Sequence, residues 1–211
     1  MATGASRTVA RARPGNEDDK ARRRAQIMTA AKRAFARKGY HATTIADVAK
    51  SARMSYGSVY WYFDSKDALF HALMDAEREA LREHIATALD AAAGGDGEQL
   101  FAAAVRATFE FFEGDRAAVR LLFRDAYALG GKFERHLFGI YEQFIDEIEA
   151  SIIDGQRHGI VVQSPPRMVA FSVAALIGQL AHRRLSTDDG VPAGEVADFV
   201  VRLLLDGIRP R

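Results

Sequence analysis

The chain has 211 residues, 48% of them hydrophobic, which is enough to bury a substantial core in one large or two small domains. It contains no cysteine, which excludes disulfide scaffolds and thiolate metal sites. The N-terminus lacks the apolar core of a signal peptide, and no apolar run approaches the roughly 20 residues that a membrane-spanning helix needs. We therefore expect a soluble, cytoplasmic protein with no membrane partner.

The charges are distributed unevenly along the chain. Residues 1–66 carry 14 Lys/Arg against 5 Asp/Glu, a net charge of +9, whereas residues 67–211 carry 15 against 23, a net charge of −8. A basic segment joined to an acidic one favours contact between the first and a polyanion such as nucleic acid. A solvated basic face without a partner would explain the same charges.

The first 20 residues are small, polar and charged, so we expect a flexible basic arm. Its Arg7, Arg11 and Arg13 either enter a DNA minor groove or belong to a terminal tail without a role. Apolar residues at helical spacing then predict a first helix from Arg22 to Lys38, with Gly39 as its stop.

Two short helices follow. Thr44 and Asp47 have the spacing of a capping box, which predicts a helix that ends near Ser51. Ser55 is positioned to cap the next helix, which runs through Tyr62.

Longer helices account for the remainder of the chain. Their expected spans are Lys66–Leu89, Glu98–Glu113, Arg116–Leu129, Lys132–His158, Pro166–Arg184 and Glu195–Ile208. Since no strand pattern or internal repeat is found, the predicted fold class is all-α with about nine helices.

Two short helices joined by a tight turn, the second capped by a serine, are what a helix-turn-helix requires. A recognition helix lies in a major groove about 12 Å wide, so its leading residues must be short or flat. Tyr56, Gly57 and Ser58 meet that demand, and Tyr60 and Tyr62 lie further along, within reach of phosphates.

Two runs of residues in this segment resemble the DNA-binding signature of the TetR family of transcriptional regulators. They are Ala42–Ala49 (ATTIADVA) and Met54–Leu69 (MSYGSVYWYFDSKDAL). The resemblance is specific over about residues 22–70; the rest matches in helix number, lengths and order. It implies a flexible arm at 1–20, a helix-turn-helix DNA-binding domain at 21–66, and a ligand-binding and dimerisation domain at 67–211. The boundary between the two domains is expected within the helix that begins at Lys66.

The resemblance also assigns the DNA-binding residues. Thr44, Tyr60 and Lys66 would contact phosphates, and Ser55, Tyr56, Gly57 and Ser58 would form the leading edge of the recognition helix. Arg53, Trp61 and Tyr62 complete the candidate set.

Several of these positions have a second interpretation. Arg53 stands where the family commonly has glycine and either changes the turn or adds a phosphate contact, and Tyr62 stands where a histidine is frequent. Trp61 either packs or touches DNA, and Gly57 either approaches DNA or serves close packing. Val59 and Phe63 are expected in the core.

The ligand pocket is expected among the aromatic residues of the second domain, where apolar or amphipathic molecules, including lipid-like ones, are favoured. The candidate residues are Phe109, Phe112, Phe123, Arg124, Tyr127, Tyr141, Phe144, Phe171 and Gln179. Most of these rings belong to the core in any case, and Arg124 and Gln179 either orient a ligand or serve an ion pair or solvated face.

The resemblance implies a homodimer paired through the last two long helices and bound to a palindromic double-stranded operator. The helix at Pro166–Arg184 is apolar nearly all round, which agrees with burial on more than one side. The alternative is a central core helix of a monomer.

No catalytic pattern is found. The six histidines lack metal-ligand spacing, and no phosphate loop, nucleophile elbow or HExxH pattern occurs. Asp146, Glu147 and Glu149 are expected as solvated charges on the outward side of a helix. We therefore predict no enzyme, no cofactor and no metal. The resemblance implies a repressor that a small effector releases from its operator. The alternatives are an activator, a ligand-independent DNA binder, or a helical interaction module without DNA binding.

Overall fold

The computed structural model describes residues 17–120, 131–187 and 190–208 of the chain. Within these ranges the chain forms nine helices and no strand, which confirms the predicted all-α fold class. The helices are α1 (Glu17–Ala42), α2 (Ile45–Ser51), α3 (Tyr56–Tyr62), α4 (Lys66–Ala91), α5 (Gly97–Gly114), α6 (Arg116–Val119), α7 (Gly131–Arg157), α8 (Pro166–Ser186) and α9 (Ala193–Ile208). No described helix combines the length and apolar character that a bilayer crossing demands.

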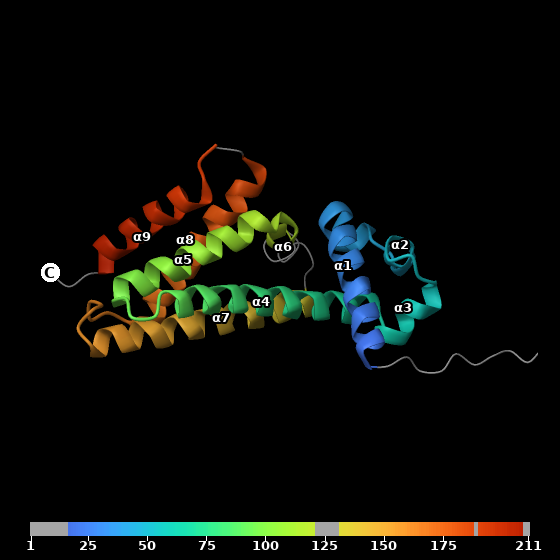
Figure 1. Ribbon diagram of the computed structural model, residues 1–211, viewed down its shortest axis with the longest axis horizontal. Coiled ribbons are helices and arrows are strands. Elements are labelled where there is room, and N and C mark those ends of the chain that lie inside the picture. Colours follow the sequence, from blue (N-terminus) through green and yellow to red (C-terminus); the bar gives the residue numbers. More distant parts are fainter. Residues whose placement is uncertain (1–16, 121–130, 188–189, 209–211) are drawn as a thin grey trace, which may run out of the picture.

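The molecule is elongated, with a head made of α1–α3 at one end and a body of mostly longer helices at the other (Figure 1). Within the body, α4 packs against α5 and α7, α5 against α9, and α7 against α8. α4 begins at the head and extends along the body, so it joins the two parts of the molecule.

The core of the head is formed by the apolar stripe predicted for the first helix and by one valine from each of the short helices. Its members include Ile27, Ala31 and Phe35 of α1, Val48 of α2 and Val59 of α3, all fully buried. The Phe35 ring meets the Phe70 ring of α4 edge to face, with 5.1 Å between centroids. Burial of these side chains fixes the angle between the two short helices and α1.

α4 contributes to two separate cores. Leu69, Leu73 and Met74 are buried with the head residues, whereas Leu81 is buried with residues of α5, α8 and α9. The change from one core to the other therefore falls inside α4, between Met74 and Leu81.

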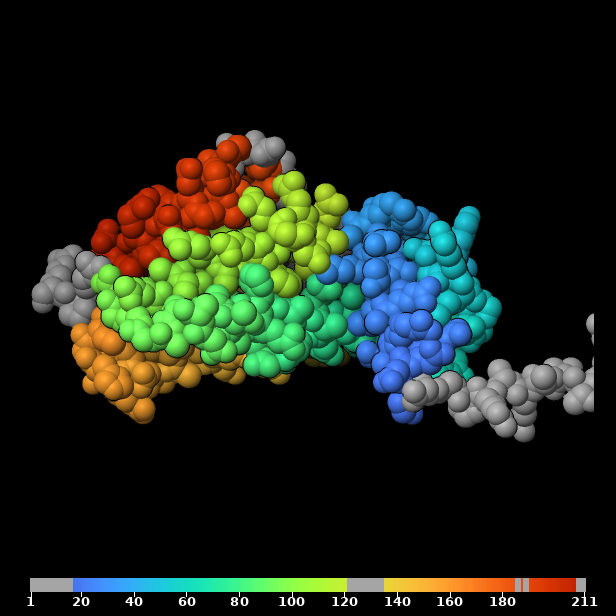
Figure 2. Space-filling view, viewed as in Figure 1, coloured from blue at the N-terminus to red at the C-terminus, as the bar shows by residue number. Residues whose placement is uncertain are grey.

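A cluster of charged side chains joins the head to the body. Lys32 of α1 binds Glu77 of α4, with 2.6 Å between Nζ and Oε2, and also binds Asp115 at the junction of α5 and α6. The Lys32 and Glu77 side chains are only 18% and 8% exposed. The α5–α6 corner lies directly against α1 (Figure 2). The orientation of α1 on the body is therefore held by an ion cluster in which Lys32 and Glu77 have little access to water.

The structure corrects one boundary of the predicted arm. Residues 17–20 are helical, because Glu17, Asp18 and Asp19 place three acids in the first turn of α1, where the helix dipole favours negative charge. Gly39, with φ 78°, interrupts the helix where the sequence predicted a stop. Two predictions lie outside the described residues. They are the arm residues Arg7, Arg11 and Arg13, and most of the part of the predicted helix Arg116–Leu129 that follows Val119.

The ion cluster leads to a stability prediction. Lys32→Met removes the cation that compensates the buried Glu77 carboxylate, so we expect the free energy of unfolding to fall by about 3 kcal/mol near neutral pH. Burial raises the pKa of the Glu77 carboxyl. A raised pKa in the folded state means that the folded protein binds the proton more tightly than the unfolded chain, so acidification favours folding at this site.

The loss should therefore shrink as the pH is lowered from about 7 to about 5, as measured by urea unfolding at each pH. Lys50→Met is the control, since Lys50 is an exposed lysine of the same head, and it should leave stability nearly unchanged. An equal loss for Lys32→Met at both pH values would contradict the buried-carboxylate explanation.

Candidate DNA-binding head and effector cavity

The start of α2 is fixed by the predicted capping box. The Thr44 hydroxyl accepts a hydrogen bond from the backbone N–H of Asp47 at 3.1 Å, and the Asp47 carboxylate accepts one from the backbone N–H of Thr44 at 3.0 Å. Lys38 binds the same carboxylate, and this bond, together with those from Thr44, holds the pKa of Asp47 well below its ordinary value. Thr44 itself remains exposed at the beginning of the helix.

The turn between α2 and α3 adopts the conformation that normally calls for glycine. Arg53 has φ 53°, in the left-handed region. The N–H of Met54 donates to the carbonyl of Ala49 at 2.9 Å and the N–H of Arg53 to that of Lys50 at 3.2 Å, which is the Schellman pattern of a helix end. Arginine therefore occupies the left-handed position without changing the turn, and its side chain is exposed.

The first turn of α3 is capped as the sequence predicted. Ser55 Oγ accepts a hydrogen bond from the N–H of Ser58 at 3.1 Å and lies 2.7 Å from the Ser58 hydroxyl. Val59 and Phe63 are buried, which confirms their expected place in the core. α3 is therefore held by one face, and the opposite face is left to solvent.

Large aromatic side chains occupy that open face. Tyr56, Tyr60 and Trp61 are 55%, 39% and 64% exposed. Tyr56 donates a hydrogen bond to the Tyr60 hydroxyl at 3.2 Å, which pairs the two rings. A Cβ built at Gly57 meets no described atom within 4 Å, so close packing inside the described part of the molecule does not account for the glycine.

Two of the predicted contact residues are tied into the head instead. The Lys66 ammonium lies over the Tyr40 ring and donates to the backbone carbonyls of Tyr40 and Thr43, at 3.0 and 3.1 Å. These bonds hold the end of α1 and the residue after it, and the role of Lys66 as a phosphate anchor stays a prediction. Tyr62 is half-buried against the head core.

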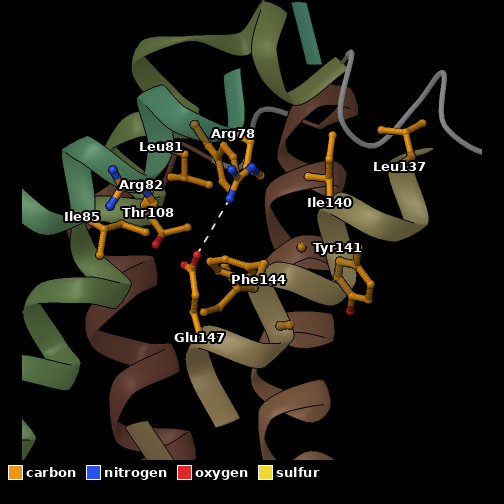
Figure 3. A pocket seen from close by; sticks show the side chains of 14 residues that line it. Arg78, Leu81, Arg82, Ile85, Thr108, Leu137, Ile140, Tyr141, Phe144 and Glu147 are labelled. Atoms are coloured by element: carbon orange, nitrogen blue, oxygen red, sulfur yellow. Dashed lines mark ion pairs between the residues drawn. The ribbon is translucent and has the colours of Figure 1, made fainter. Parts of the chain in front are cut away.

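The body contains an apolar cavity between α4, α5, α7 and α8 (Figure 3). Of the predicted pocket residues, Phe112, Tyr141 and Phe144 line it. Leu137 and Ile140 of α7 also line it, and both pack against the core of the head. The wall of the cavity is therefore continuous with the head.

A second section of about 700 Å³ extends this cavity along the body. The two sections share part of their lining, so they adjoin, and together they are called the elongated cavity below; the shared residues are Ile85, Thr108, Phe144, Glu147 and Ile177. Most of the exposed lining is apolar, as expected of a site for an apolar or amphipathic molecule.

Other predicted pocket residues lie elsewhere. Phe171 and Gln179 are exposed on the outside of α8, because the sequence marks aromatic and polar residues without giving the direction in which a helix presents them. Phe109 is buried in the body core away from the elongated cavity, at the edge of a small separate hollow. Phe123, Arg124 and Tyr127 lie outside the described residues.

Three charged residues on the wall were not predicted to face a cavity. Arg78 and Arg82 come from α4 and Glu147 from α7, and Arg78 Nη1 lies 3.9 Å from Glu147 Oε1. Glu147 is exposed, as expected of a solvated charge, and it also lines the cavity. Asp146 and Glu149, expected as solvated in the same way, bind Arg167 of α8.

A capped helix-turn-helix head joined to a helical body with an internal apolar cavity has the architecture of a one-component helix-turn-helix regulator. A model for a family described as bacterial regulatory proteins, tetR family, matches residues 27–73, which cover most of α1, all of α2 and α3 and the first part of α4. The matched segment contains the capped turn and the recognition helix.

Two curated regulators are similar to this chain. TtgR of Pseudomonas putida is 45% identical over 65 residues, which are 31% of this chain and 30% of that protein. The transcriptional activator FasR of Mycolicibacterium smegmatis is 26% identical over 205 residues, covering 97% of this chain and 91% of that protein. The match thus spans less than a third of TtgR but nearly the whole of FasR.

Among solved structures, the Bacillus subtilis regulator FadR in complex with stearoyl-CoA superimposes with a TM-score of 0.79, covering 88% of this chain and 99% of that chain at 18% identity. At this identity the likeness shows the shared fold. The family model over the head and the two curated relatives support a TetR-family DNA-binding transcriptional regulator. Transcriptional regulators are not enzymes, in line with the prediction against catalysis.

The left-handed arginine yields a second prediction. Arg53→Gly removes the steric strain at φ 53° while adding flexibility to the unfolded chain, so we expect a net gain of roughly 0.5–1 kcal/mol in the free energy of unfolding. Arg53→Ala removes the same charge but keeps the strain, so it should give no such gain. Urea unfolding of both variants checks this, and equal stabilities would contradict it.

Proposed function

We propose that this protein is a ligand-responsive transcriptional regulator that binds operator DNA as a homodimer through α3. The proposed DNA contacts are the first turn of α3 on base edges and the flanking residues on phosphates. Repression, with release by an apolar or amphipathic effector, is the first candidate activity.

The observation that carries this proposal is the open face of α3. Tyr56 and Trp61 are exposed over half or more of their surface although aromatic side chains of this size are usually covered. They flank Gly57, where the helix backbone is accessible to a partner. A narrow helix presenting flat side chains from a basic head fits a major groove.

Dimer formation is supported by apolar side chains that the described part of the chain leaves uncovered on the last two helices. Met168 and Phe171 of α8 are 67% and 53% exposed, and Phe199 and Leu203 of α9 are 53% and 50% exposed. An isologous contact through these helices would duplicate the head by two-fold symmetry. Two recognition helices placed roughly 34–36 Å apart would read a palindromic site.

The effector proposal is supported by the elongated apolar cavity and by the stearoyl-CoA that the structurally similar FadR binds. Leu137 and Ile140 connect the cavity wall to the head core. An occupant that shifts α7 or α4 would change the relative position of the two DNA-binding heads and thereby the affinity for the operator.

An activator is the second candidate. FasR, the relative that matches over 97% of this chain, is named a transcriptional activator. Transcription in vitro from the bound promoter, with and without the protein, separates the two: a fall in transcript supports repression and a rise supports activation.

DNA recognition by α3 is tested with an operator duplex selected from a random library by the purified protein. Tyr56→Ala should weaken operator binding by about tenfold to a hundredfold, because a base-edge contact is lost, and should barely change binding to unrelated duplex. Phe138→Ala, which removes a 62% exposed ring from the body, is the control and should bind normally.

Arg53→Gly tests a phosphate contact in the same assay. It should weaken binding to all duplexes by a similar factor and reduce the slope of affinity against salt by about 1. If the wild-type protein ignores duplex DNA at low ionic strength, the regulator proposal fails and the helical interaction module takes its place.

Dimer formation through α9 gives a further prediction. Leu203→Glu buries a charge in the proposed interface, so we expect sedimentation at micromolar concentration to show monomer where the wild type shows dimer. Ile160→Glu, at an exposed apolar residue in the segment between α7 and α8, should remain dimeric. A dimeric Leu203→Glu variant would contradict the assignment of α9 to the interface.

A further inference from the structure

The cavity has a polarity that follows its length. Apart from Glu147, which both sections share, the charged residues lining the section nearer the head are Arg78 and Arg82, whereas those of the larger section are Glu98 and Asp154. The walls between them are mostly apolar. A long occupant therefore meets positive charge at the end nearer the head and negative charge at the other.

The two arginines differ in how fully they are engaged. Arg82 binds Glu79 through two hydrogen bonds, from Nε at 3.0 Å and from Nη2 at 2.5 Å. In the described part of the chain, Arg78 has Glu147 as its acidic partner at 3.9 Å, which is too long for a hydrogen bond. Figure 3 shows the side chains of Arg78 and Glu147 facing each other across the cavity.

A guanidinium carries five donors in a planar fork that matches a carboxylate or phosphate. The Arg78 side chain is 31% exposed, so its surroundings are partly shielded from water and its donors are poorly used by the protein. This combination is suited to an anionic group supplied from outside.

We propose that Arg78 is the head-group site of an anionic amphiphile, a carboxylate or phosphate attached to a long aliphatic chain. The anion replaces Glu147 as the partner of Arg78, and the chain extends into the larger section, past Phe144 and Ile148. This inference rests on the proposed function, because it names the chemical class of the effector for the same cavity.

The acids of the larger section support this orientation. Glu98 and Asp154 repel an anion at the far end, so the head group is directed towards Arg78. Displacement of Glu147 also removes an ionic contact between α4 and α7, the two helices that reach the head core through Met74 and Leu137. Binding of the head group and loosening of the α4–α7 contact are therefore one event.

The test measures binding by calorimetry with four probes kept below their micelle concentrations: palmitate, palmitoyl-CoA, hexadecanol and hexadecyltrimethylammonium. Palmitate or palmitoyl-CoA should bind the wild type about tenfold to a hundredfold more tightly than hexadecanol, since a charge-assisted hydrogen bond is gained. Hexadecyltrimethylammonium should be the weakest ligand.

Arg78→Gln should remove that advantage, whereas the matched variant Arg82→Gln on the same helix and the same wall should keep it, because Arg82 is already bound to Glu79. If Arg78→Gln loses the affinity advantage of palmitate over hexadecanol, the head group is a carboxylate. If the variant loses the advantage of palmitoyl-CoA alone, the head group is a phosphate. Glu147→Gln removes the competing carboxylate and should raise the affinity for the anionic probes several-fold. This variant tests the site even if Arg78→Gln does not fold.

The head-group site would be overturned if hexadecanol and both anions bound equally tightly and their affinities did not change in Arg78→Gln and Glu147→Gln. It would also be overturned if hexadecyltrimethylammonium were the tightest ligand. Such results leave operator release by an apolar effector intact. If none of the four probes binds the wild type while operator binding persists, the amphiphile inference is overturned and the proposed DNA-binding function is not.

Discussion

One ammonium group ties the head to the body through charge. Lys32 places its charge between Glu77 of α4 and Asp115 at the α5–α6 junction, and little water reaches Lys32 and Glu77, whereas Asp115 is more open. Removing one partner would leave an uncompensated charge in a poorly solvated place, so the cluster resists separation of the elements that carry it. Any movement of the α5–α6 corner is therefore passed to α1, and with it to the helix-turn-helix that packs on α1.

A second connection is apolar and involves the cavity itself. Leu137 is buried with the head core, and Ile140 packs against the same core, yet both side chains line the cavity. Closely packed side chains do not yield smoothly to an occupant; they move to another packed arrangement. An occupant at this end of the cavity therefore acts on residues that already touch the head.

The head could be predicted from sequence because its determinants are local. The caps at Thr44 and Ser55 and the stripe through Ile27 and Phe35 depend on neighbours within one or two turns. The buried Glu77 was missed, although it occupies an apolar stripe at four-residue spacing with Leu69, Leu73 and Leu81, a pattern that signals a buried charge with a partner elsewhere. The partner, Lys32, lies 45 residues away, and no local pattern identifies it. The direction of Phe171 and the contact of Arg78 with Glu147 likewise depend on how long helices pack, which spacing alone does not determine.

The position of Arg78 shows how short the route from ligand to DNA can be. Arg78 lies four residues after Met74, the last α4 residue of the head core, which is one helical turn or roughly 6 Å along the axis. Glu77, which anchors Lys32, is its immediate neighbour in sequence. An anion that binds Arg78 therefore lies next to the ion cluster that orients α1. It also lies one helical turn from the core that supports α3. Coupling between cavity and operator would then need no extended chain of residues, because α4 carries the head core, the ion cluster and the cavity wall within a few turns.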